Sequence, residues 1–147
     1  MESMEGKSTT DGFVEPTLVD VRANWSCIKP HIEKLLKENP TQTFIPEDVY
    51  CDCINEKAYL FASPVGFLIL TIEIDRYTKD KTLYMWIAYT YKKGTNQWVA
   101  HADWLNKVAK HFGCKYIEAQ SNVDELEPYA LKHGWSLDTR IYRRNVK

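Results

Sequence analysis

The sequence has little net charge and no long apolar run. Its 19 Lys and Arg residues face 20 Asp and Glu residues, which gives a formal net charge of −1 at pH 7. The protein therefore lacks the large net charge that would attract it to nucleic acid or to a membrane surface. No apolar segment is long enough to cross a bilayer, and residues 1–11 contain no apolar signal region. We expect a cytoplasmic protein whose partners include neither nucleic acid nor a membrane.

Cysteine is sparse and lacks the spacing of a metal site. The four cysteines are scattered through the chain, which favours reduced thiols inside a cell. Cys51 and Cys53 are separated by one residue, whereas the common zinc knuckle needs two, and the four histidines stand alone. We therefore expect no metal.

The length of 147 residues fits one compact domain with a core of its own. The first residues are mostly Ser, Thr, Glu and Gly and offer little apolar surface to bury. We expect residues 1–15 to form a flexible tail and residues 16–147 a single domain.

The first half of the chain predicts two helices between short strands. The expected elements are a strand over Thr17–Arg22, a helix capped by Asn24 or Ser26 and ended by Asn39-Pro40, a shorter helix that opens in Phe44–Asp48 and runs to about Asn55, and strands over Ala58–Ala62 and Gly66–Asp75. Pro30 should lie near the first turn of its helix, because deeper in a helix proline removes a hydrogen bond. Residues 67–72 are nearly all apolar, so their strand should be central and covered on both faces.

The second half predicts a strand-helix-strand-helix unit. The expected elements are a strand over Leu83–Tyr91, an amphipathic helix from Trp98 to Phe112 ended by Gly113, a strand over Lys115–Gln120, a helix from near Val123 to Gly134-Trp135, and a last strand over Arg140–Arg144. The strands on either side of the long helix should be parallel. The fold class is thus α/β with a mixed sheet, in the order β-α-α-β-β-β-α-β-α-β.

The loop before the long helix, residues 91–97, has the features of an anion site. The first turn of a helix exposes unpaired N–H groups at the positive end of its dipole. Lys92, Lys93 and Gly94 add positive charge and conformational freedom. A phosphate-bearing ligand is one interpretation, and an ordinary solvated turn, favoured by loop composition alone, is the other.

This order of elements, with the helix ending Ala-Lys-x-x-Gly-Cys and the chain continuing to Lys-His-Gly-Trp, resembles the GNAT superfamily of acyl-CoA N-acyltransferases. The family loop has a Gln/Arg-x-x-Gly-x-Gly/Ala pattern. Lys92 in the first position places Thr95 and Gln97 at the small positions, whereas Tyr91 there places Gly94 and Asn96. The family Tyr of the closing helix corresponds to Ala130, one residue after Tyr129.

The resemblance implies an acetyl-CoA or other acyl-CoA cofactor and a primary amine substrate. The residues that it assigns to the cofactor are Lys92, Lys93, Gly94, Thr95, Asn96 and Gln97 at the pyrophosphate and Asn122 near the pantetheine arm. Asn122 could instead cap the helix that follows it.

Amine acylation also needs a base for the amine and an acid for the leaving thiolate. Glu73, Asp75 and Glu118 are candidate bases, and alternation puts Glu118 on the same face of its strand as Tyr116. A carboxylate that faces the sheet interior could have a raised pKa, whereas one that faces outward is a surface charge. Tyr129 is the candidate acid, or else a core residue.

A second hypothesis is a GNAT-fold protein that has lost catalysis and binds another protein. The stretch Trp86-Ile87-Ala88-Tyr89 and the altered loop resemble small GNAT-like proteins of tailed phages, some of which are virion-associated. This alternative implies a protein partner in place of an amine.

Overall fold

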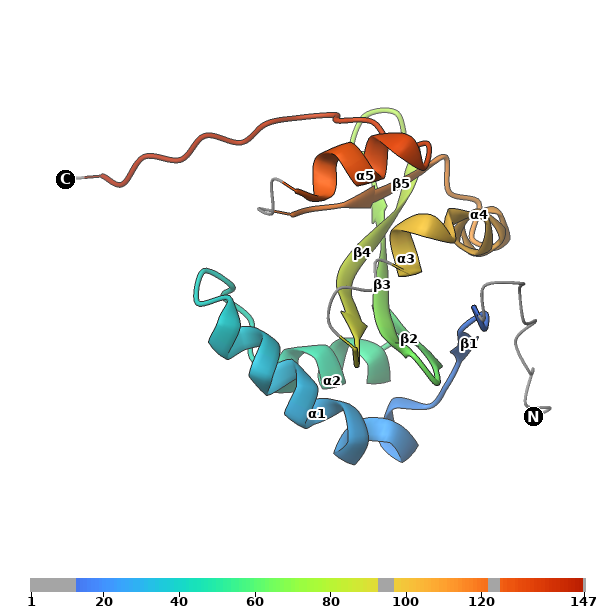
Figure 1. The fold of residues 1–147 in the computed structure, drawn as a ribbon, viewed down its shortest axis with the longest axis vertical. Helices are drawn as coiled ribbons and strands as arrows, with labels where there is room; N and C mark the ends of the chain where they lie inside the picture. The colour runs from blue at the N-terminus through green and yellow to red at the C-terminus, as the bar shows by residue number, and fades with distance from the viewer. Residues whose placement is uncertain (1–12, 93–96, 122–124, 147) are drawn as a thin grey trace.

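The computed structural model describes residues 13–92, 97–121 and 125–146, and in them one five-stranded sheet has the order β1-β2-β3-β4-β5 (Figure 1). The strands are β1 Thr17–Leu18, β2 Ala58–Ser63, β3 Gly66–Ile74, β4 Lys81–Thr90 and β5 Tyr116–Ala119. The helices are α1 Val21–Glu38, α2 Pro46–Ile54, α3 Gln97–Ala100, α4 Ala102–His111 and α5 Leu126–Lys132. Strands β1 to β4 are antiparallel and β4 pairs with β5 in parallel, as the sequence predicts.

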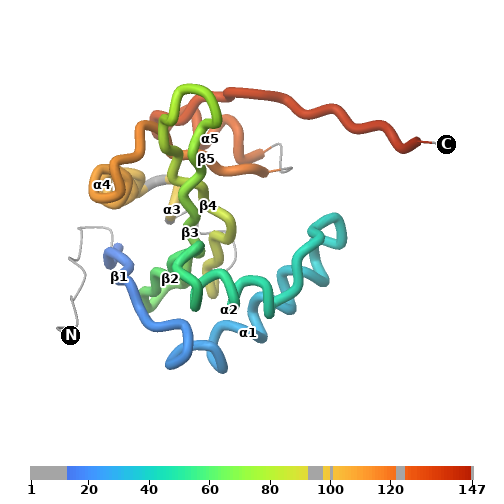
Figure 2. The backbone as a smooth tube through the Cα atoms, turned by 180° about the vertical axis from the view of Figure 1, so that it is seen from behind, coloured from blue at the N-terminus to red at the C-terminus, as the bar shows by residue number. Residues whose placement is uncertain are grey.

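The apolar strand β3 lies at the centre, between two cores. Phe67, Leu68, Ile69 and Leu70 are all 0% exposed, which confirms the prediction of a strand covered on both faces. Phe67 and Ile69 belong to the core beneath α1 and α2, whereas Leu68 and Leu70 belong to the core beneath α4. The ribbon and the reversed view place these two groups of helices on opposite sides of the sheet (Figures 1 and 2).

The first helix begins earlier than the sequence predicts. Asp20, in extended conformation, caps α1 by accepting a hydrogen bond from the Arg22 N–H at 3.0 Å, so neither Asn24 nor Ser26 is the cap. The predicted strand over Thr17–Arg22 is correspondingly short. Pro30 lies well inside α1 rather than in its first turn, and the packing of Ile28 and Ile32 in the core offsets the hydrogen bond that it removes. The helix ends at Asn39, as predicted.

The predicted long helix is divided into α3 and α4 at His101. Phe13, from the segment expected to be a flexible tail, packs at this break and is only 2% exposed. Glu15 forms an ion pair with Lys107 at 2.9 Å. Residues 13–15 are thus packed against the domain, while residues 1–12 of the expected tail lie outside the described residues. Whether residues 16–147 form an independent domain stays a prediction.

The expected last strand over Arg140–Arg144 does not form in the described residues. These residues have no regular secondary structure, and Ile141 and Tyr142 are 76% and 88% exposed. The C-terminal segment leaves the sheet in an extended path (Figure 1). The residues of this segment have a high β-propensity, but propensity alone does not form a strand, because a strand also needs a neighbouring edge with which to pair.

Candidate functional site

The parallel strands β4 and β5 separate halfway along β4. Strand β5 pairs with β4 only from Thr82 to Met85. At the next residue, Trp86, the register of β4 against β3 shifts, which marks a β-bulge. From residue 86 to residue 90, one edge of β4 has no strand partner in the described part of the chain. Such an edge presents backbone N–H and C=O groups to a ligand.

The basic loop begins where this edge ends. Lys92 is exposed, and its carbonyl accepts a hydrogen bond from the Thr90 hydroxyl at 3.2 Å. The site residues Lys93, Gly94, Thr95, Asn96 and Asn122 lie outside the described residues, and Gln97 is the first residue of α3. The described structure therefore places Lys92 directly after the unpaired edge of β4, and the predicted contacts of the loop stay a prediction.

The three candidate carboxylates are all exposed. Asp75 accepts hydrogen bonds from the N–H groups of Tyr77 and Thr78, which lower its pKa and make it a poor base. It also lies in the β3–β4 turn, at the opposite end of β4 from the loop.

Glu118 lies opposite Tyr84 in the parallel pair. Burial raises the pKa of the Tyr84 hydroxyl, and the charges of Glu73 and Glu118 raise it further. Both carboxylates therefore lie near Tyr84, so the sheet brings two of the candidate bases together. Glu118 itself is exposed and so has the outward position that the sequence reasoning associated with a surface charge. Its catalytic role stays a prediction.

Tyr129 lies half-buried on α5, and its ring contacts His133 at a centroid distance of 4.6 Å. No residue of α5 is fully buried. The following Trp135 donates an indole hydrogen bond to the Val99 carbonyl of α3 at 3.3 Å. This bond attaches the segment after α5 to the helix that follows the basic loop.

An aromatic cluster at the carboxyl end of β4 was missed by the sequence reasoning. His31 of α1 places Nδ1 3.1 Å from the Tyr89 hydroxyl, and the contact is partly buried. The His31 ring also lies 4.9 Å from that of Tyr91 and packs near Phe67. A sequence signal did exist, because His31 stands beside the core residue Ile32 and Tyr89 and Tyr91 alternate on one strand, but only the fold brings them together.

A cavity of about 220 Å³ adjoins this cluster. Its lining residues come from the last turns of α1 and the end of β4: Lys34, Leu35, Glu38, Asn39, Ala88, Tyr89, Thr90 and Tyr91. Three consecutive residues at the end of β4 and the next residue, Tyr91, line it although the side chains of a strand alternate between its two faces, so the cavity reaches the strand backbone. These residues lie in the part of β4 with which β5 does not pair.

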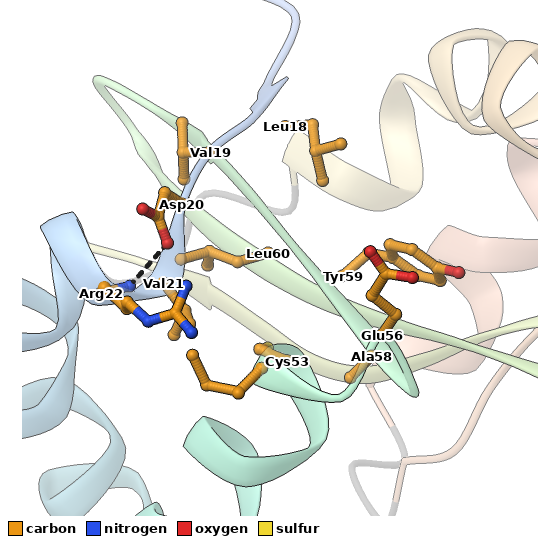
Figure 3. Close-up of a pocket in the computed structure, with 11 residues that line it drawn as sticks. Leu18, Val19, Asp20, Val21, Arg22, Cys53, Glu56, Ala58, Tyr59 and Leu60 are labelled. Atoms are coloured by element: carbon orange, nitrogen blue, oxygen red, sulfur yellow. Dashed lines mark hydrogen bonds between the residues drawn. The ribbon is translucent and has the colours of Figure 1, made fainter.

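A second cavity, of about 250 Å³, lies between β2, the start of α1 and the end of α2 (Figure 3). Asp20, which caps α1, and Cys53 line it. Burial, with a smaller contribution from the Asp52 carboxylate, raises the pKa of the Cys53 thiol to about 11. A thiol held protonated is a poor nucleophile and metal ligand, so this cavity has no evident chemistry.

In the described ranges, no three His, Cys, Asp or Glu side chains come close enough to hold a metal ion. No described helix combines the length and the apolar character needed to span a membrane.

This architecture, an antiparallel sheet that becomes parallel at β4–β5 and opens beyond a bulge, is the GNAT fold. Solved acetyltransferases share it. A Pyrococcus furiosus protein assigned as an acetyl transferase matches 90% of this chain and 100% of its own, with a TM-score of 0.67 and 16% identity. The Brucella melitensis ribosomal-protein-alanine N-acetyltransferase matches 90% and 100% of the two chains, with a TM-score of 0.62 and 16% identity.

A third neighbour is the aminoglycoside acetyltransferase meta-AAC0020, from an uncultured soil metagenomic sample, in complex with sisomicin. It matches 95% of this chain and 100% of its own, with a TM-score of 0.62 and 14% identity. No protein-family model matches the sequence, and no curated protein is similar to it. At these identities the likeness is one of fold.

Proposed function

We propose that the protein is an N-acyltransferase that moves an acetyl or other acyl group from acyl-CoA to a primary amine. The observation that carries the proposal is the unpaired edge of β4 beyond the bulge at Trp86, with the basic loop directly after it. The pantetheine arm of coenzyme A contains amide groups, which can pair with such an edge as a neighbouring strand would.

The described residues fit this cofactor in two respects. The opening between β4 and β5 offers backbone partners to an amide-bearing arm, and the exposed Lys92 offers positive charge to a pyrophosphate. In the proposal, Lys93, Gly94, Thr95, Asn96 and Gln97 complete the pyrophosphate site and Asn122 lies near the arm. When bound, acyl-CoA supplies an activated acyl carbon, and the protein has only to orient the amine and move protons.

Tyr129 is the proposed acid and Glu118 the proposed base. Tyr129 is half-buried on the helix that closes the domain, and Glu118 lies on β5, one of the two strands that form the opening. The acyl acceptors of the structural neighbours support an amine as the substrate class. Two of these neighbours are an aminoglycoside acetyltransferase and the glucosamine-6-phosphate N-acetyltransferase of Arabidopsis thaliana.

A second candidate is a GNAT-fold protein that binds a protein partner without catalysis. It is favoured by Ala130 at the position of the family's tyrosine, and by the loop, in which neither register supplies both small residues of the family pattern. The phage-encoded, virion-associated form of this candidate rests on the sequence resemblance alone.

Calorimetry with acetyl-CoA and with CoA distinguishes the acyltransferase from the non-catalytic binding protein. We expect both to bind with micromolar affinity, and a panel of primary amines should then reveal acetyl transfer. An absence of binding heat at high ligand concentration, together with a stable complex with a protein partner, would overturn the enzyme proposal.

A further inference from the structure

We propose that residues 140–144 add as a further strand to the outer edge of β5 in a second copy of this chain, so that two copies exchange their C-terminal segments. The outer edge of β5 is the edge that faces away from β4. This interaction surface lies outside the opening between β4 and β5, so it does not depend on the acyl transfer proposed above.

The outer edge of β5 has no strand partner. In the described part of the chain, β5 is the last strand of the sheet and pairs only with β4. An edge strand presents backbone N–H and C=O groups on which another strand can form, and proteins often block such an edge with proline or a bulge. Strand Tyr116–Ala119 contains no proline and keeps a regular register with β4. Its edge can therefore accept a strand from elsewhere.

The C-terminal segment has the residues of a strand and no such partner in its own described chain. Ile141 and Tyr142 favour β-structure and are 76% and 88% exposed. Arg140 lies 4.0 Å from Glu127, so the segment begins its course beside α5 and not along the edge of β5. From there it continues in an extended path, and its end lies clear of the domain in both views (Figures 1 and 2).

Alternation gives β5 an apolar and a polar face. Ile117 packs against the core beneath α4, whereas Tyr116 and Glu118 are exposed. Lys115, which precedes the strand, already pairs with Asp80 at 3.5 Å. The polar face of β5 therefore offers an aromatic ring and a carboxylate to a neighbouring strand.

The C-terminal segment has the matching pattern. In a strand, Arg140, Tyr142 and Arg144 lie on one face and Ile141 on the other. With Ile141 on the apolar face of β5, the two arginines and the tyrosine come to the face that carries an acidic and an aromatic side chain. Opposite charges and aromatic pairs are both favourable between neighbouring strands. Arg143 shares the face of Ile141, and its long side chain can reach solvent from the end of the segment.

A second copy is the occupant that satisfies both open features. An unrelated peptide would cover the edge of β5 and leave the C-terminal segment exposed. When two copies are related by a two-fold axis, each gives its segment and receives that of the other, and the assembly closes at two chains.

The length of the segment allows this exchange. The Trp135 indole donates a hydrogen bond to the Val99 carbonyl at 3.3 Å, which attaches the start of the segment to α3. An extended chain covers about 3.3 Å per residue, so residues 136–146 can reach about 35 Å beyond this attachment. This reach is enough to cross to a neighbouring molecule and run along a strand as short as β5.

The first test measures the mass of the full chain in solution by size-exclusion chromatography with light scattering. We expect twice the mass of one chain, with dissociation on dilution, and the mass of one chain for a variant that ends at Ser136. A single-chain mass for the wild type at every concentration, or a dimer that persists after the truncation, would overturn the proposal.

The second test replaces one residue of the exchanged strand. Proline has no N–H to donate and is disfavoured inside a sheet, so Ile141→Pro should raise the dissociation constant of the dimer at least about tenfold. The matched control is Val146→Pro, at a side chain 98% exposed and beyond the proposed strand, and it should leave the constant unchanged. Equal constants in the wild type and both variants would contradict strand pairing.

Hydrogen exchange distinguishes a second copy from the chain's own edge. We expect amides in residues 116–119 and 140–144 to exchange slowly in concentrated protein and faster after dilution, because pairing between copies is lost as the dimer dissociates. Slow exchange that is independent of concentration would place the segment on β5 of its own chain and overturn the exchange between copies. These readouts use no acyl-CoA, so their outcome is independent of the proposed enzyme activity.

Discussion

Phe13 stacks on His101, with ring centroids 3.9 Å apart and an interplanar angle of 6°. His101 is the residue that separates α3 from α4, and Phe13 also meets the edge of Trp98 at 6.2 Å. The segment before the first strand is thus bound to the break in the helix that follows the proposed cofactor loop. Phe13 therefore packs both against Trp98 of α3 and against the residue that separates the two helices.

Replacement of Phe13 should therefore destabilise the fold. Removal of a buried phenylalanine ring typically costs 3–5 kcal/mol, so we expect Phe13→Ala to lower the free energy of unfolding by about 3 kcal/mol in urea titrations. Leu18→Ala, at a side chain 45% exposed, is the matched control and should cost much less. Equal losses in the two variants would contradict the packing of Phe13.

The loop lysines should affect cofactor affinity and not stability. We expect the double variant Lys92→Ala/Lys93→Ala to bind CoA more weakly than the wild type, with the larger difference at low salt, where exposed charges are least screened. Calorimetry at two ionic strengths measures this effect. The control Lys57→Ala/Lys81→Ala removes the same charge from exposed residues, of which Lys81 begins β4 at the end opposite the loop and Lys57 directly precedes β2. If all three proteins bind CoA equally, the loop lysines are not part of the site.

Tyr129 should act on the chemical step. We expect Tyr129→Phe to lower kcat while CoA affinity stays nearly constant, because loss of a transition-state interaction lowers turnover without weakening ground-state binding. Tyr142→Phe, at a side chain 88% exposed, is the control. If Tyr129 only packs against the domain, activity will persist and stability will fall by at most about 1 kcal/mol. Normal turnover in Glu118→Gln would separately remove Glu118 as the base.

The raised pKa of Cys53 predicts a loss of stability at alkaline pH. The unfolded thiol ionises near 9.0, whereas the folded thiol keeps its proton up to about 11. Between these values the unfolded state binds fewer protons than the folded state, so stability falls as the pH rises from 9 to 11. Thermal melts of the wild type and Cys53→Ser across this range should differ in slope, the variant showing the shallower decline. Parallel declines would contradict the shift.

The same shift predicts the order of thiol reactivity. At pH 8 we expect iodoacetamide to modify the exposed Cys27 and Cys51 before Cys53, because the thiolate is the reactive form. Mass spectrometry of peptides from a time course measures this order. Early modification of Cys53 would show that its thiol is not protected.

Several elements of the fold could be predicted because their signals are local. The turn between Ser63 and Gly66, the buried strand after it and the helix end at Gly113, whose φ is +71°, each depend on a few adjacent residues. The parallel pairing of β4 and β5 also followed from the sequence, because a strand-helix-strand connection has a strongly preferred handedness.

The candidate site was predicted only in part. The position of the basic loop at the end of β4 followed from the order of elements. The contact between His31 and Tyr89 joins residues 58 positions apart, and no local pattern encodes the face of α1 that meets the end of β4.

The sequence by itself determined the mixed α/β class and the order of most elements, since hydrophobic periodicity and turn residues act over short distances. Only the tertiary structure decided which residues find a hydrogen-bond, packing or strand-pairing partner. Asp20 became the cap of α1, Phe13 found the break at His101, and residues 140–144 formed no strand in the described chain. The physical reason is that propensity favours a conformation in each segment, whereas burial and strand pairing depend on residues that the fold brings near from elsewhere in the chain.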